Sequence, residues 1–164
     1  MTIASEAVQP PPRSEGLACM EVWGGNEATF STFEKAGVDI WLYSRPCGND
    51  TNGGDLYYLS SCASGRITRM LVADVAGHGE SVAAVSSGLR GLMHRYINTI
   101  RPQQLFEEVN EEFSKLSSAD RFATSVVSSY FMPTGTLSIC NAGHPTPFIR
   151  RAVGGRWEML EIPE

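Results

Sequence analysis

Two short acidic segments of this chain carry the side chains best suited to chemistry. Asp55 closes a Gly-Gly-Asp triplet, and Asp74 opens the segment Asp-Val-Ala-Gly-His-Gly. Residues 55–61 and 67–74 are rich in apolar, aromatic and β-branched side chains, so they predict two strands of a hairpin. Because paired strands lie about 4.8 Å apart, we expect Asp55 and Asp74 to lie side by side at the open end of this hairpin.

This pair of aspartates predicts a site for a hard divalent cation. Two carboxylates so close repel each other unless a proton or a cation lies between them. A donor set made only of oxygens suits Mg²⁺ or Mn²⁺ better than zinc. Glycine lets backbone, water and metal approach closely, and it permits a sharp turn from strand to helix that frees carbonyls to act as ligands. The residues that this argument adds to the two aspartates are Gly53, Gly54, Gly77, Gly79 and the carbonyl of Val75.

Each of these motifs also has a purely structural interpretation. A single Gly-Gly-Asp is usually a turn, and an Asp before a helix is usually its N-cap, so the metal hypothesis depends on the pairing of Asp55 with Asp74. His78 could be a ligand, a general acid or a phosphate contact, or it could cap the helix. Asn141 and His144 belong to Asn-Ala-Gly-His-Pro, which could support the site or form a bend stabilised by hydrogen bonds.

The remaining elements predict an α+β domain. After residue 79 apolar side chains recur every three or four residues up to Ile100, which predicts a long helix. A second helix should begin at Pro102, because proline is favourable in the first turn. The order of strands, two helices and then strands favours antiparallel sheet over a doubly wound fold. Further strands are expected at 38–43, 123–131, 137–141, 147–151 and 157–162.

Length and composition limit the classes of protein that this chain could be. Its 164 residues correspond to one domain, and its 42% hydrophobic content is ordinary for a globular fold. Thirteen basic against eighteen acidic residues give a net charge of −5, without a basic stripe, so no nucleic-acid partner is expected. Residues 1–16 contain three consecutive prolines and are expected to be a flexible leader, which leaves 17–164 for the folded domain.

The sequence shows no targeting features. Its start has neither the positive n-region nor the apolar core of a signal peptide, and no apolar run approaches the roughly 20 residues that span a bilayer. The four cysteines form no Cys-x-x-Cys pair, so a structural zinc site is not expected. We therefore expect a cytoplasmic protein with reduced thiols and no membrane partner.

Four motifs in order give the chain a family resemblance. Asp55 in its triplet, Asp74 in its segment, Phe-Ala-Thr at 122–124 and Asn-Ala-Gly-His-Pro at 141–145 resemble the SpoIIE-like branch of the metal-dependent (type 2C) serine/threonine protein phosphatases. The resemblance covers about residues 38–162. It implies an αββα sandwich, in which two antiparallel sheets pack together and are flanked by helices.

The resemblance also implies an enzyme of signal transduction. It implies two Mn²⁺ or Mg²⁺ ions that activate a bridging water for attack on phosphoserine or phosphothreonine, with Asp55, Asp74 and the Val75 carbonyl as ligands. Family members commonly act on phosphorylated regulatory proteins such as anti-sigma-factor antagonists, and they are often switched on when the two helices move. The alternative is a catalytically impaired module that binds a phosphoprotein or signalling partner without turnover.

One departure from the family pattern concerns the end of the sequence. The family continues with a Thr-Asp-Gly motif whose aspartate completes the metal centre, whereas this sequence ends at Glu164 without that motif. We therefore expect a partial phosphatase catalytic domain that lacks the C-terminal part and is weakened at one metal site. An unfinished sheet would also expose an edge through which two copies could form a homodimer.

Overall fold

The computed structural model describes eight ranges of the chain: 20–25, 27–45, 54–62, 65–77, 80–96, 98–99, 101–116 and 121–161. The predicted leader lies outside these ranges, as do three of the predicted site residues, Gly53, His78 and Gly79. The expectations for these residues therefore rest on the sequence alone.

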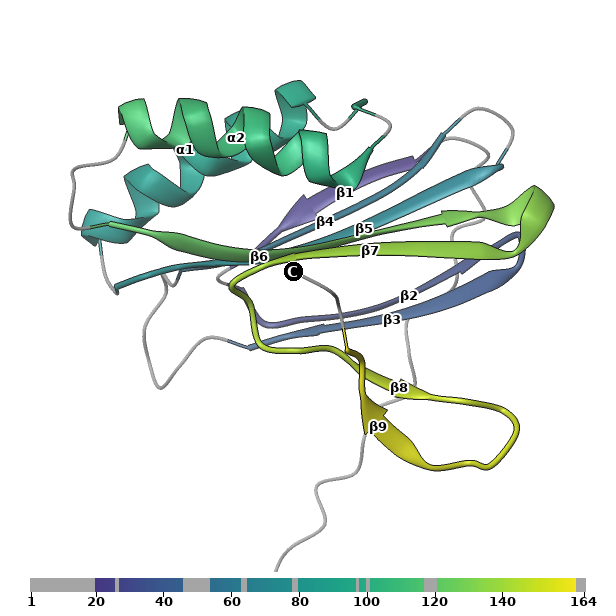
Figure 1. Cartoon of the computed structure of the whole chain (residues 1–164). Helices are drawn as coiled ribbons and strands as arrows, with labels where there is room; N and C mark the ends of the chain where they lie inside the picture. The colour runs from purple at the N-terminus through teal and green to yellow at the C-terminus, as the bar shows by residue number, and fades with distance from the viewer. Residues whose placement is uncertain are drawn as a thin grey trace, which may run out of the picture.

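A five-stranded antiparallel sheet forms the centre of the described fold (Figure 1). Its strands are β1 (Met20–Gly24), β4 (Asp55–Cys62), β5 (Ile67–Val75), β6 (Ala123–Phe131) and β7 (Thr136–Ala142). They follow the spatial order β1-β4-β5-β6-β7. The pairing of β4 with β5 confirms the hairpin that the sequence predicts, with one residue added to the end of each strand.

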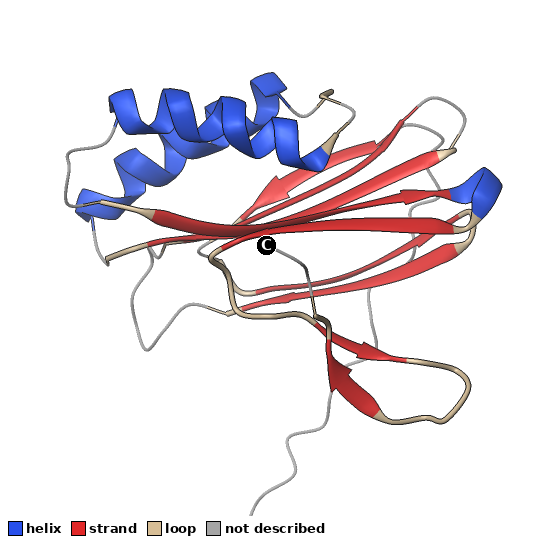
Figure 2. Cartoon of the chain, in the orientation of Figure 1, coloured by secondary structure: helices blue, strands red, loops and turns tan. Residues whose placement is uncertain are grey.

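The two α-helices, α1 (Glu80–Tyr96) and α2 (Pro102–Leu116), cover one face of this sheet, and a short 3-10 helix, η1 (Met132–Thr134), forms the turn between β6 and β7 (Figure 2). α2 begins at Pro102 as predicted, whereas α1 ends at Tyr96, so the prediction of a helix reaching position 100 is wrong at its end. Neither of these two helices combines the length and the apolar content that crossing a membrane requires. The core between helices and sheet includes Leu71, Val75, Leu89, Met93, Leu105 and Val109.

The opposite face of the sheet packs against a hairpin of two strands, β2 (Thr29–Lys35) and β3 (Val38–Ser44), which lies below it in Figure 1. Phe33 of β2 and Leu59 of β4 are buried together in the core between these layers. β3 confirms the strand predicted at 38–43, whereas β2 is absent from the prediction. The helices, the large sheet and this hairpin form three layers of the expected αββα sandwich, so the α+β class is confirmed.

A short hairpin of two strands, β8 (Phe148–Arg150) and β9 (Trp157–Met159), follows β7 along the chain. It lies beyond the β2–β3 hairpin in Figure 1. β9 is shorter than the strand predicted at 157–162, and its three residues are all exposed. β9 pairs with all three residues of β8, and a hydrogen bond of 2.8 Å from the Leu160 N–H to the Pro147 carbonyl extends this pairing by one step.

Candidate metal centre

Three neighbouring strands bring polar side chains into one row at an end of the large sheet. Asp55 is the first residue of β4, and it pairs with Asp74, the next-to-last residue of β5. On the other side of Asp74, the register of β6 places Thr124 directly opposite. Directly paired residues point to the same face of a sheet. We call Asp55, Asp74 and Thr124 the acidic row, and it confirms the predicted proximity of the two aspartates.

The acidic row lies on the face of the sheet that is turned away from the helices. Successive side chains of a strand point to opposite faces. Ala73 and Val75 flank Asp74, are both 0% exposed, and belong to the core beneath the helices. Asp74 itself is exposed. The end of β5 is therefore held in place by its apolar neighbours while its carboxylate stays accessible.

Gly54 allows the end of β5 to approach the start of β4 closely. Its carbonyl accepts a hydrogen bond of 3.1 Å from the Val75 N–H, which continues the pairing of the two strands beyond Asp55. A Cβ on Gly54 would collide with the Val75 carbonyl oxygen and would lie 2.8 Å from Asp74 Oδ1. The bare backbone of Gly54 thus lets a carbonyl oxygen and a carboxylate oxygen approach it more closely than any side chain would allow.

The proximity of the two carboxylates changes the acidity of Asp55. Partial burial raises the pKa of Asp55, the negative charge of Asp74 raises it further, and His144 acts in the opposite direction. A like charge disfavours ionisation, whereas a nearby positive charge favours it. A divalent cation between the two carboxylates would therefore relieve their repulsion.

A polar bend after β7 carries His144 toward the acidic row. Asn141 closes this bend, because its Nδ2 donates to the His144 carbonyl at 2.8 Å and its Oδ1 accepts from the His144 N–H at 2.9 Å. Gly143 has a φ of 70°, a left-handed conformation that glycine adopts readily. The His144 ring meets Thr124, with 3.0 Å between Nδ1 and Oγ1. The hydrogen-bonded bend is confirmed, and it also places an imidazole near Asp55.

The turn from β5 toward α1 begins as the sequence predicts. Gly77 has a φ of 121°, which strains other residue types, and a Cβ there would lie 2.7 Å from Val82 Cγ2. The backbone therefore turns tightly at this position. Since Gly79 and His78 are not among the described residues, their roles in the turn and in catalysis stay predictions.

The donors present in and beside the acidic row fit a hard divalent cation. Asp55, Asp74 and the Val75 carbonyl offer only oxygen, which Mn²⁺ and Mg²⁺ prefer. Within the described ranges, no group of three His, Cys, Asp or Glu side chains is close enough to hold a metal ion. The oxygen donors of the described residues would form one side of a coordination shell, and Mg²⁺ in proteins commonly keeps several water ligands.

The chain matches a known protein family. Residues 64–163, more than half of the chain, match the family described as stage II sporulation protein E (SpoIIE). The chain belongs to the SpoIIE family. The matched region contains Asp74, Val75 and the His144 bend of this SpoIIE-family chain, whereas Asp55 precedes it.

Two solved structures resemble this SpoIIE-family chain. The RsbU and RsbW domains of Rv1364c from Mycobacterium tuberculosis match 70% of the chain, with a TM-score of 0.61 and 27% identity. The phosphatase domain of the cell fate determinant SpoIIE from Bacillus subtilis matches 91% of it, with a TM-score of 0.47 and 15% identity. The chain spans 32% of the first protein's length and 56% of the second's. The family match and the first structure confirm the predicted type 2C-like phosphatase fold.

Sequence reasoning assigned no role to Thr124, although it noted the Phe-Ala-Thr motif that contains this residue. Thr124 reaches the acidic row because β6 runs antiparallel to β5, so that the start of β6 lies at the end of β5. Two helices separate these strands along the chain. The position of the Phe-Ala-Thr motif at the start of a predicted strand is the signal that could have indicated this contact. A strand that pairs antiparallel with β5 after the helices begins beside Asp74.

Proposed function

We propose that this chain carries the catalytic site of a metal-dependent protein serine/threonine phosphatase. One observation supports the proposal most: in a member of the SpoIIE family, Asp55 and Asp74 face each other across β4 and β5. The reaction is hydrolysis of phosphoserine or phosphothreonine, in which water attacks phosphorus and the side-chain oxygen leaves. The substrate that we propose is a phosphorylated regulatory protein, such as an anti-sigma-factor antagonist, so the enzyme would act in signal transduction.

The proposed cofactor is a pair of Mn²⁺ or Mg²⁺ ions. Asp55, Asp74 and the Val75 carbonyl would hold them, since these groups offer oxygen donors that lie close together beside Gly54. When bound, two such ions lower the pKa of a shared water and offset negative charge on the transferring phosphoryl group.

The chain's own residues position and polarise the reactants in this proposal. Asp55 and Asp74 concentrate negative charge at a solvent-accessible strand end, which attracts cations. Ala73 and Val75 fix that strand end in the core, so the carboxylates keep their separation. Thr124 holds the His144 ring at Nδ1, which leaves Nε2 for a hydrogen bond to water or to a phosphoryl oxygen.

His78 has two further roles in the proposal, both taken from the sequence. It follows Asp74 in the Asp-Val-Ala-Gly-His-Gly segment. As a general acid it would protonate the leaving oxygen, and as a phosphate contact it would orient the substrate. A pH–rate profile of a His78→Ala variant separates the two roles, because only loss of a general acid removes the limb of the profile at high pH.

Hydrolysis of p-nitrophenyl phosphate and of a phosphoserine peptide, with and without Mn²⁺, tests the proposal. The assay uses this chain and a chain extended through the Thr-Asp-Gly motif of the family. We expect Asp74→Asn to lower the Mn²⁺-dependent rate of the extended chain about 100-fold or more, because a charged ligand is lost. Asp39→Asn is the matched control, since Asp39 is an exposed aspartate of β3 in the β2–β3 sheet. An undiminished rate in Asp74→Asn, with folding intact, would falsify the assignment.

The second candidate function is a module that binds a phosphoprotein without turnover. It is favoured by the small number of acidic side chains that the described residues bring together at the acidic row. Tight binding of the phosphoserine peptide without hydrolysis, in both chains and with Mn²⁺ present, would support this candidate. Hydrolysis by the extended chain alone would instead support the phosphatase and would identify the additional carboxylate as necessary for turnover.

A further inference from the structure

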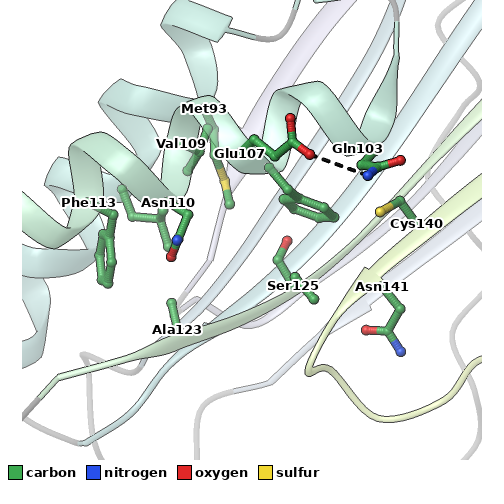
Figure 3. A pocket seen from close by; sticks show the side chains of 13 residues that line it. Met93, Gln103, Glu107, Val109, Asn110, Phe113, Ala123, Ser125, Cys140 and Asn141 are labelled. Atoms are coloured by element: carbon green, nitrogen blue, oxygen red, sulfur yellow. Dashed lines mark hydrogen bonds between the residues drawn. The ribbon is translucent and has the colours of Figure 1, made fainter. Parts of the chain in front are cut away.

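A cavity of about 320 Å³ lies between α2 and the helix-facing side of β6 and β7 (Figure 3). This volume is at the lower end of the range for small-molecule pockets. Ala123 and Ser125 line the cavity, whereas Thr124 between them belongs to the acidic row on the other face of the sheet. The cavity therefore opens on the opposite face of the sheet from the acidic row, and the two regions share Asn141, which closes the His144 bend.

Large apolar side chains from the helices stand opposite small side chains from the sheet in this cavity. Met93 of α1 and Val109 and Phe113 of α2 are buried and form its helical wall. Ala123 and Ser125 of β6 form part of the opposite wall. Because the small sheet residues do not fill the distance to the helix, the walls leave a partly open space that suits a compact apolar group such as one aromatic ring system.

Polar groups meet this apolar space at one side. Glu107 of α2 carries the only charge among the described residues that line the cavity, and its Oε1 accepts a hydrogen bond of 3.3 Å from Gln103 Nε2. In Figure 3 these two residues lie on the helix side, and Cys140 lies on the sheet side. Burial raises the pKa of the Cys140 thiol, and the charge of Glu107 raises it further, so the carboxylate acts across the cavity.

We propose that this cavity binds a small apolar amine, with one aromatic or branched aliphatic body and one ammonium group. The body would lie between Phe113 and Ala123, and the ammonium group would pair with Glu107. No Lys or Arg is among the described lining residues, so a carboxylate of the same shape meets no cationic side chain there and is repelled by Glu107. Such a ligand contacts both α2 and the sheet and fastens the helix to β6 and β7.

Calorimetric titration with tryptamine and with indole-3-propionate tests this inference on the chain as it is. The two probes share the indole ring and the two-carbon linker and differ in the sign of their charge. We expect tryptamine to saturate the site below about 1 mM and to bind at least about tenfold more tightly than indole-3-propionate. It should also slow the alkylation of Cys140 by iodoacetamide, measured by mass spectrometry of the peptide that contains it. Equal affinities, no binding, or an unprotected Cys140 would each overturn the proposal.

Substitutions inside and outside the cavity test whether tryptamine binds there. Glu107→Gln should weaken tryptamine binding about fivefold to tenfold. Glu111→Gln removes the same charge from the same helix outside the cavity, where Glu111 pairs with Lys115, and should leave binding unchanged. Cys140→Phe should abolish tryptamine binding, because the larger side chain fills the cavity. If this variant fails to fold, Ala142→Leu replaces it, because Ala142 also lines the cavity and is exposed. Retained binding in the folded filling variant would overturn the proposal.

Sedimentation of the free chain tests the other occupant of this space, a second copy of the chain. A monomer that binds tryptamine supports the amine site. A dimer that dissociates in the folded filling variant would show that the partner copy occupies the cavity, and that result would overturn the proposal.

Discussion

Two rows of residues cross the same three strands, and they differ in almost every physical respect. Tyr58, Leu71 and Val127 pair side by side in the middle of β4, β5 and β6, and all are at most 3% exposed. We call them the buried row. Burial raises the pKa of Tyr58 to about 12, so its hydroxyl stays neutral. The acidic row crosses the same strands at their ends, with two exposed carboxylates side by side.

The difference teaches that these strands separate stability from chemistry. The buried row stabilises the fold by removing apolar surface from water. The acidic row costs stability in the absence of a cation, because two like charges lie across one strand pair. Sites that bind or react commonly carry such a cost. Substitutions in the buried row should therefore change folding, and substitutions at the acidic row should change metal binding more than folding.

The largest expected effect on stability comes from Leu71→Ala in the buried row. Leu71 is 2% exposed, and truncation of such a side chain leaves a cavity, so the free energy of unfolding should fall by about 3 kcal/mol. Urea unfolding followed by circular dichroism measures this change. Val72→Ala is the control one residue away, because Val72 is 42% exposed and should cost less than about 1 kcal/mol. Equal losses in the two variants would remove the contrast between the faces of β5.

Gly54→Ala tests whether the close approach of Val75 and Asp74 to Gly54 is needed for metal binding. The new Cβ would meet the Val75 carbonyl and Asp74 Oδ1, so Mn²⁺ affinity should fall about tenfold or more, with a loss of about 1–3 kcal/mol in unfolding free energy. Gly91→Ala is the matched control. A Cβ on Gly91, within α1, has no atom within 4 Å, so this variant should gain up to about 1 kcal/mol and keep its Mn²⁺ affinity. Wild-type Mn²⁺ affinity in a folded Gly54→Ala variant would contradict the proposed role of this close approach in metal binding.

The smallest effect concerns the pH dependence of the metal-free chain. The pKa of Asp55 is raised in the folded state, so the folded chain binds more protons than the unfolded chain between the unfolded value, about 3.9, and the raised value. Stability therefore falls as the pH rises through that window. Asp74→Asn removes the charge repulsion between Asp74 and Asp55, which causes part of this loss of stability. At pH 7 the variant should therefore unfold at a higher urea concentration than the wild type.

The advantage of Asp74→Asn should stay below about 1 kcal/mol, because the carboxylates are exposed, and it should shrink toward pH 4. Urea titrations in EDTA at both pH values give the difference in unfolding free energy between wild type and Asp74→Asn. The contributions of the other acidic groups cancel in this difference. A difference that is constant with pH, or that grows in acid, would contradict the repulsion.

Much of the large sheet follows from local sequence patterns. The β4–β5 hairpin and the start of α2 could be predicted because apolar spacing and turn residues act over a few positions. β2 escaped prediction because its aromatic residues, Phe30 and Phe33, are three positions apart, which does not fit the alternation of a strand. The glycine at position 37 is the signal in the sequence that could have indicated a hairpin leading into β3. In the structure Gly37 has a φ of 80°, which fits a sharp turn.

The acidic row could be predicted only in part. Asp55 and Asp74 belong to one hairpin, so their spacing along the chain determines their proximity. Thr124 and His144 reach the row through the pairing of β6 with β5 and through the bend after β7. Such contacts depend on tertiary register, which local spacing does not encode.

Titration of Mn²⁺ into the chain, with free Mn²⁺ followed by electron paramagnetic resonance, tests the central claim most directly. If Asp55 and Asp74 share a cation, wild type should deplete free Mn²⁺, and Asp55→Asn and Asp74→Asn should each weaken binding at least about tenfold. Asp39→Asn should bind as wild type does. Undiminished Mn²⁺ binding in folded Asp55→Asn and Asp74→Asn variants would contradict the claim that the acidic row is a metal centre.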